Sequence, residues 1–85
     1  MNEHMNKQMM LYAVRLTYLD PGQSSESTAY FVDKDEAYKY AYRNVDSQDE
    51  SIVSCCVYAY VYEEDEKIYV PRGYENIEPR IPMDL

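Results

Sequence analysis

The sequence predicts an α+β domain of ββαββ order, in which one helix packs on one face of a four-stranded antiparallel sheet. Three observations lead to this prediction. Four segments combine alternating polarity with many β-branched and aromatic residues, which indicates strands. One segment between the second and third of these has helical periodicity and a capping signal. With one helix between two hairpins, the simplest unknotted strand order is 2-1-3-4.

The first predicted hairpin joins residues 10–19 to residues 27–32. Residues 10–19 (MLYAVRLTYL) alternate so that tyrosines, a valine and a leucine share one face, while Ala13, Arg15 and Thr17 share the other. The intervening DPGQSSE holds a proline–glycine pair suited to a turn, and its serines indicate a longer loop. Residues 27–32 (STAYFV) then return as the second strand.

Residues 34–45 carry the clearest helix signal of the chain. Asp33 is suited to the N-cap, and Glu36 follows at the spacing of a capping box. At about 100° per residue, alanine, tyrosine and valine side chains fall on one side of this helix. The side that should pack on the sheet carries Ala37, Tyr38, Ala41, Tyr42 and Val45.

The third predicted strand, residues 51–62 (SIVSCCVYAYVY), has two different faces. Its even positions form a tyrosine ladder away from the helix, which a tyrosine-bearing face of the first strand should join. The acidic turn EEDE then leads to a short fourth strand, residues 67–71 (KIYVP). The odd positions of the third strand are small and apolar, as is suited to packing under a helix: Val53, Cys55, Val57, Ala59 and Val61.

These elements define a single domain of residues 10–71. Residues 1–9 are polar and lack periodicity, so we expect disorder there. Residues 72–85 hold two further prolines and no period, so we expect an extended C-terminal tail. An aromatic sheet face is a large apolar patch that calls for an occupant. Three candidates would cover it: the tail, a second copy of the chain, or a different protein.

Composition argues against several classes of function. The formal net charge is -8, from 16 acidic and 8 basic residues. This charge argues against a protein that binds nucleic acid by neutralising phosphates, and it fits a protein whose partner has a basic surface. The one histidine, His4, lies outside the predicted domain, and two glycines cannot form a phosphate-binding loop. The EEDE turn lacks the spacing of a calcium loop. We therefore expect no enzymatic activity, no cofactor and no metal.

Cys55 and Cys56 are adjacent, so their side chains should point to opposite faces of a strand and remain unpaired. Two free thiols and no recognisable secretory signal lead us to expect a cytoplasmic protein. The sequence has no apolar run of the roughly 20 residues that a membrane-spanning helix needs.

Acidic residues and the tyrosine ladder form the candidate partner-binding site. The topology should bring the acids at the helix start and those of the EEDE turn to one end of the domain. Acids just after the helix are disfavoured by its dipole, which indicates that negative charge is kept there for another reason. The candidate partner-binding residues are Glu63, Glu64, Asp65, Glu66, Tyr58, Tyr60, Tyr62, Asp46, Asp49 and Glu50.

In size, acidity and fold complexity, the chain resembles small phage-encoded antidefence proteins, a class that includes anti-CRISPR proteins and DNA mimics. The resemblance rests on this profile and carries no motif from which residue roles could be transferred. It implies a non-catalytic, protein-binding inhibitor in the bacterial host cytosol. Its acidic surface would block a basic nucleic-acid-binding partner, without direct contact to nucleic acid or membrane. The alternative is a structural accessory protein that homodimerises through its tyrosine-rich sheet face.

Overall fold

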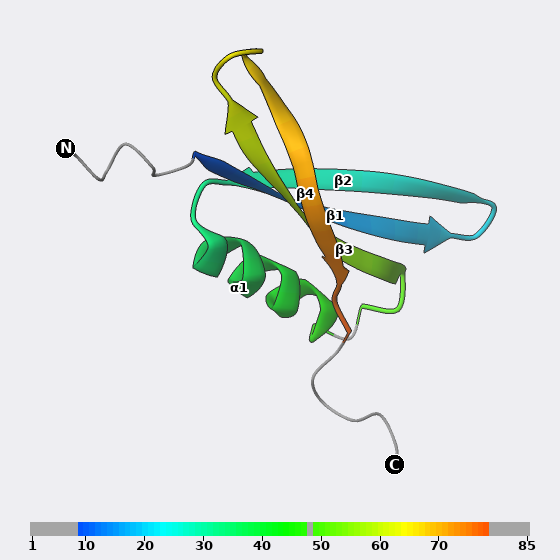
Figure 1. The fold of residues 1–85 in the computed structure, drawn as a ribbon. Helices are drawn as coiled ribbons and strands as arrows, with labels where there is room; N and C mark the ends of the chain where they lie inside the picture. The colour runs from blue at the N-terminus through cyan, green and yellow to red at the C-terminus, as the bar shows by residue number, and fades with distance from the viewer. Residues whose placement is uncertain (1–8, 48, 79–85) are drawn as a thin grey trace.

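The computed structural model describes residues 9–47 and 49–78. Its elements are β1 (Met10–Asp20), β2 (Gln23–Phe31), α1 (Lys34–Val45), β3 (Ile52–Glu63) and β4 (Ile68–Asn76). The predicted ββαββ order and the strand order β2-β1-β3-β4 are both confirmed, and every neighbouring pair is antiparallel. Figure 1 shows α1 on one side of the sheet, with the turn of the β3–β4 hairpin extending away from it.

The β1–β2 hairpin is tighter than predicted, because β2 begins at Gln23 and not at Ser27. Pro21 and Gly22 alone connect the strands, and Asp20 pairs with Gln23. Proline fixes the first turn position, and Gly22 has a φ of 89°, so the pair forms a type II turn. The serines that indicated a loop are exposed strand residues, in a part of the hairpin that extends past α1 (Figure 1).

Helix α1 has the bounds that the sequence predicts. Asp33 is its N-cap, and the backbone N–H of Asp35 donates to the Asp33 carboxylate at 3.0 Å. Ala37 and Ala41 are fully buried. Their small side chains let the helix axis lie close to the sheet, and the larger tyrosines beside them pack around the edges of the contact.

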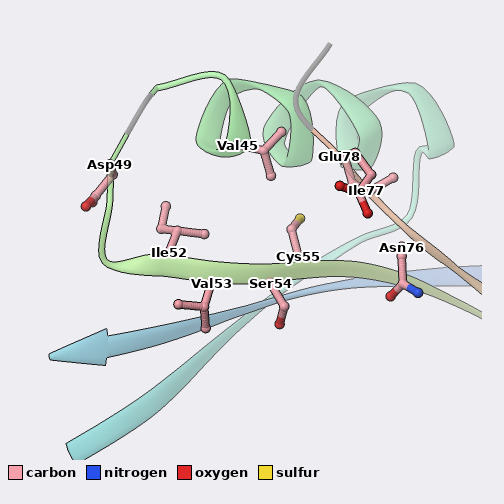
Figure 2. Close-up of a pocket in the computed structure, with 9 residues that line it drawn as sticks. All are labelled: Val45, Asp49, Ile52, Val53, Ser54, Cys55, Asn76, Ile77 and Glu78. Carbon is pink, nitrogen blue, oxygen red and sulfur yellow. The ribbon is translucent and has the colours of Figure 1, made fainter. Parts of the chain in front are cut away.

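The hydrophobic core lies between α1 and the sheet, and no polar or charged residue of the described chain is buried. A β-bulge near Thr17 changes which side chains of β3 enter it. Ile52 and Cys55 point toward α1, whereas Val53 points away and is 54% exposed (Figure 2). The prediction that Val53 packs under the helix is therefore wrong. The buried cluster consists of Val14, Leu16, Ala37, Ala41, Cys55, Val57 and Ile77.

Strand β4 continues to Asn76, beyond the strand end predicted at Pro71. A proline is tolerated inside this strand because β4 is an edge strand, where a missing N–H need not break a ladder bond. The register also shifts between Ala59 and Tyr60, so β4 has a bulge at this point. The fourth strand is therefore longer, and less regular, than its sequence indicates.

The first part of the predicted tail belongs to the folded domain. Ile77 is 5% exposed within the core, and its N–H donates to the Cys55 carbonyl at 2.9 Å. Residues 72–76 are thus strand and Ile77 is core, so the folded domain continues past the predicted end at residue 71. Residues 1–8 and 79–85 lie outside the described residues, as do the predictions made for them.

Candidate functional site

The face of the sheet opposite α1 carries the candidate partner-binding surface. The ladder of Tyr58, Tyr60 and Tyr62 lies on this face, because β3 keeps its alternation through these positions. The prediction that a tyrosine-bearing face of the first strand joins this ladder is wrong, because the tyrosines of β1 pack against the core on the helix side. The β1 residues beside the ladder are Leu11, which pairs with Tyr60, Ala13, which pairs with Tyr58, and Arg15, whose side chain contacts Tyr58.

Strand β4 supplies the aromatic neighbours of the ladder. Tyr58 stacks on Tyr74 with ring centroids 5.8 Å apart, and Tyr62 contacts Tyr69 with centroids 5.1 Å apart. Tyr74 is 68% exposed, and Tyr30 of β2, on the same face, is 65% exposed. Large aromatic area is therefore open to solvent here. We call this surface the tyrosine face, and it consists of Tyr30, Tyr58, Tyr60, Tyr62, Tyr69 and Tyr74.

Arg15 lies within this surface and orients Tyr58. Its guanidinium carbon is 4.8 Å from the centroid of the Tyr58 ring, and one of its N–H groups donates to the Tyr58 hydroxyl. The guanidinium is also 3.6 Å from the carboxylate of Glu26 on β2. The hydrogen bond to Tyr58 raises the pKa of Arg15, and the charge of Glu26 adds to this effect. The positive charge of Arg15 is therefore engaged by partners within the chain.

The acids of the β3–β4 turn continue the tyrosine face. Glu63 follows Tyr62 directly and pairs with Ile68 at the end of the hairpin. Residues 63–66 are all exposed. Lys67 closes the turn with a φ of 59°, and its N–H donates to the Glu63 carbonyl at 2.7 Å. The structure thus places negative charge directly beside aromatic area. We call this group the acidic tip, and it consists of Glu63, Glu64, Asp65 and Glu66.

The acids at the start of α1 do not join the acidic tip. In Figure 1, the β3–β4 turn and the start of α1 lie on opposite sides of β1 and β2. Sheets twist, so the end of a long hairpin is carried away from a helix that packs on the sheet centre. Topology alone does not reveal this separation, and the expectation of one acidic end is wrong.

The acids that follow α1 take part in local structure. Asp49 accepts hydrogen bonds from the Ser51 backbone N–H at 3.0 Å and the Ser51 hydroxyl at 2.7 Å. These bonds lower the pKa of Asp49. Asp46 is the C-cap of α1, and its N–H donates to the Tyr42 carbonyl at 2.9 Å. The helix dipole disfavours a carboxylate at Asp49, but the hydrogen bonds to Ser51 close the loop before β3 and account for its presence there. Glu50 is exposed.

A cleft of about 170 Å³ lies where the end of α1 meets the start of β3 and the end of β4. Figure 2 shows the residues that line it. Val45, Ile52 and Ile77 form its apolar lining, and the Cys55 side chain points toward α1. Burial, with a smaller contribution from Cys56, raises the pKa of Cys55 to about 11. The thiol therefore stays protonated near neutral pH and acts as a core side chain, not as an activated nucleophile.

Four residues of the surface escape sequence reasoning: Arg15, Tyr30, Tyr69 and Tyr74. The alternation of the fourth strand, continued past Pro71, would have placed Tyr69 and Tyr74 near the β3 ladder. The sequence could also have placed Arg15 on the surface. Val14 and Leu16, on the other face of β1, are better core residues than Ala13 and Thr17, so the face with Arg15 should point away from the helix.

Within residues 9–47 and 49–78, no group of three or more His, Cys, Asp or Glu side chains could hold a metal ion. In the same part of the chain, no helix is both long enough and apolar enough to cross a membrane. Comparison of the chain with known protein families, curated proteins and solved structures finds no match.

Proposed function

We propose that this protein is a non-catalytic, protein-binding inhibitor that covers a basic surface of a nucleic-acid-binding partner. The observation that supports this most is the exposed tyrosine face, which α1 leaves uncovered and which ends at the acidic tip. Tyrosine is enriched at binding hot spots and offers a large contact area at low cost in conformational entropy. The acidic tip and the net charge of -8 favour a basic partner.

Direct binding of single-stranded nucleic acid is disfavoured by the same geometry. Bases stack on aromatic sheet faces when basic side chains around them hold the phosphates. Here the tyrosine face adjoins acids, and Arg15 is paired with Glu26. A protein whose own function is to bind nucleic acid has a basic surface that complements the acidic tip. The profile of phage-encoded antidefence inhibitors agrees with such a partner.

The two parts of the surface should contribute differently to binding. Tyrosines buried at the centre of an interface mainly slow dissociation, whereas charges near its rim mainly speed association and make it depend on salt. Tyr74→Ala should therefore raise the dissociation rate. Charge reversal at the acidic tip should lower the association rate, and most strongly at low salt.

The first experiment is capture of partners from bacterial lysate by the tagged protein at low salt, followed by mass spectrometry and repeated with competing duplex DNA. We expect a basic nucleic-acid-binding protein that the DNA displaces. Glu64→Lys/Glu66→Lys should abolish its capture. Glu36→Lys/Glu78→Lys is the matched control, because it makes the same charge change at exposed acids away from the acidic tip and should retain the partner.

Capture that neither the tip variant nor Tyr74→Ala weakens would contradict the proposal, and so would a partner indifferent to DNA. Recovery of only the untagged copy of the same protein would indicate self-association, and the alternative function places that contact on the tyrosine face. Tyr60→Glu tests that alternative, since a charge on the ladder should dissociate such a dimer in light scattering.

A further inference from the structure

The two edges of the sheet differ in how they are protected against pairing with another strand. β4 contains Pro71, which has no N–H, and its register is broken by a bulge. β2 pairs with β1 in unbroken register from Gln23 to Phe31 and contains no proline, lysine or arginine. In the described part of the chain, no segment pairs with the outer side of β2. β2 is therefore the open edge of the sheet.

The backbone groups that β2 presents at this edge follow from the turn. The turn bonds Asp20 to Gln23, and bonded and non-bonded pairs alternate from there along an antiparallel ladder. The Leu19 N–H agrees with this alternation, because it points away from β2 and donates to the Ser51 carbonyl at 2.7 Å. The residues whose N–H and C=O groups point outward are Ser24, Glu26, Thr28 and Tyr30.

The side chains of β2 allow a second strand to approach. Ser25, Ser27 and Ala29 are small, and the strand carries one charged residue, Glu26. That charge is offset within the chain, because the Glu26 carboxylate lies 3.6 Å from the guanidinium of Arg15. Lysines, which often protect natural edge strands, are missing from β2.

We propose that the outer edge of β2 pairs antiparallel with β2 of a second copy of this chain. An antiparallel pair of identical strands has a twofold axis, so the contact closes as a dimer. A pair centred on Ser27 uses all the outward-facing residues and forms about eight backbone hydrogen bonds. It sets Glu26 opposite Thr28 of the second copy, whereas a pair centred on Glu26 would oppose two like charges.

This dimer does not rest on the proposed function. It joins two sheets edge to edge and leaves both tyrosine faces on the same side of the joined sheet, free to bind. The two contacts also respond to salt in opposite directions. Each copy carries a net charge of -8, so salt should strengthen the dimer by screening repulsion, whereas it should weaken binding to a basic partner. Either proposal can therefore fail while the other stands.

Sedimentation equilibrium of the full chain, from about 1 μM to about 1 mM and at two salt concentrations, tests the pairing. We expect a reversible dimer that salt strengthens. Thr28→Pro removes one outward N–H from each copy and leaves the β1–β2 bonds intact, so it should raise the dissociation constant roughly 30-fold. Tyr60→Glu is the matched control on the tyrosine face, and it should leave the dimer unchanged.

A second edge variant, Ser25→Lys/Ser27→Lys, should also dissociate the dimer, and it decides the outcome if Thr28→Pro does not fold. Hydrogen exchange gives an independent readout: the outward amides of Glu26 and Thr28 should exchange more slowly in concentrated than in dilute protein. A chain that stays monomeric at about 1 mM overturns the proposal. So does a dimer that persists in the edge variants or dissociates in Tyr60→Glu.

Discussion

The two faces of the sheet come from the same strands and differ in almost every property. On the helix side, Leu16 and its neighbours are fully buried among aliphatic side chains. On the other side, Tyr58, Tyr74 and Arg15 are held by ring stacking, a cation–π contact and a hydrogen bond. Tyr58 and Arg15 are half-buried, and Tyr74 remains largely open to solvent. Since β3 alternates between these faces, adjacent positions can be changed to alter stability or surface chemistry separately. Three predictions test this separation.

The largest effect is expected from truncation on the helix side. Leu16 has no exposed surface, so Leu16→Ala should lower the free energy of unfolding by about 3–5 kcal/mol. Tyr74→Ala removes an exposed ring that stacks on Tyr58, and it should cost about 1 kcal/mol or less. Urea unfolding followed by circular dichroism measures both.

Equal destabilisation by these two substitutions would contradict the assignment of the faces. A loss at Tyr74 as large as that at Leu16 would mean that the tyrosine face is covered in solution. The dimer proposed above would not produce this result, because it leaves that face exposed.

The second prediction concerns the thiol on the helix side. Because the pKa of Cys55 is raised to about 11, its thiolate fraction at pH 8 should be about 100-fold below that of an ordinary cysteine. In a Cys56→Ser variant, alkylation of Cys55 should therefore be slower in the folded protein than in urea by at least that factor. Mass spectrometry of timed, quenched samples gives both rates. Similar rates in the two conditions would place Cys55 outside the core.

The smallest effect is expected at the border between helix and sheet, where the Tyr38 hydroxyl donates to Glu75 at 2.8 Å. Burial, followed by this hydrogen bond, raises the pKa of Tyr38 to about 12. An unfolded tyrosine loses its proton near pH 10, so between about pH 10 and 12 the unfolded state binds fewer protons than the folded state. The contribution of Tyr38 is therefore complete below that range and is lost as the pH rises through it.

Tyr38→Phe should consequently make the decline of stability above about pH 10 less steep. Absorbance at alkaline pH follows tyrosinate formation. In this variant, the titration curve should contain one fewer tyrosine that titrates late. An unchanged titration curve and an unchanged slope would show that Tyr38 is exposed to solvent.

The sequence predicts the helix and the strand order well, for a physical reason. Asp33 and the spacing of Ala37 and Ala41 are local signals that tertiary structure reinforces. The limits of β2 and β4 are predicted less well, because both are edge strands with exposed side chains. Serines in β2 and Pro71 in β4 are loop-like residues, and they are tolerated where one side of the strand needs no partner.

The candidate surface was predicted in part, and the limits are again physical. Alternation along β3 places Cys55 and Tyr58 on opposite faces of the sheet. Alternation along β1 also defines two faces, but it does not determine which of them packs against the helix. Tyr12 and Tyr18 pack against the core, so tyrosines on β1 and on β3 have opposite roles. Ile52 enters the core and Val53 leaves it because of a bulge, and no residue at that point signals one.

The central position of β1 has a consequence for synthesis of the chain on the ribosome. Tyr12 pairs with Phe31 on one side and with Ala59 on the other, so its two partners emerge at different times. At about 5–20 residues per second, the second partner follows the first by some seconds. During that interval the nascent hairpin exposes the inner side of β1 as well as the outer side of β2. Translation speed between these two segments therefore sets how long a chaperone or a neighbouring nascent chain has access to β1.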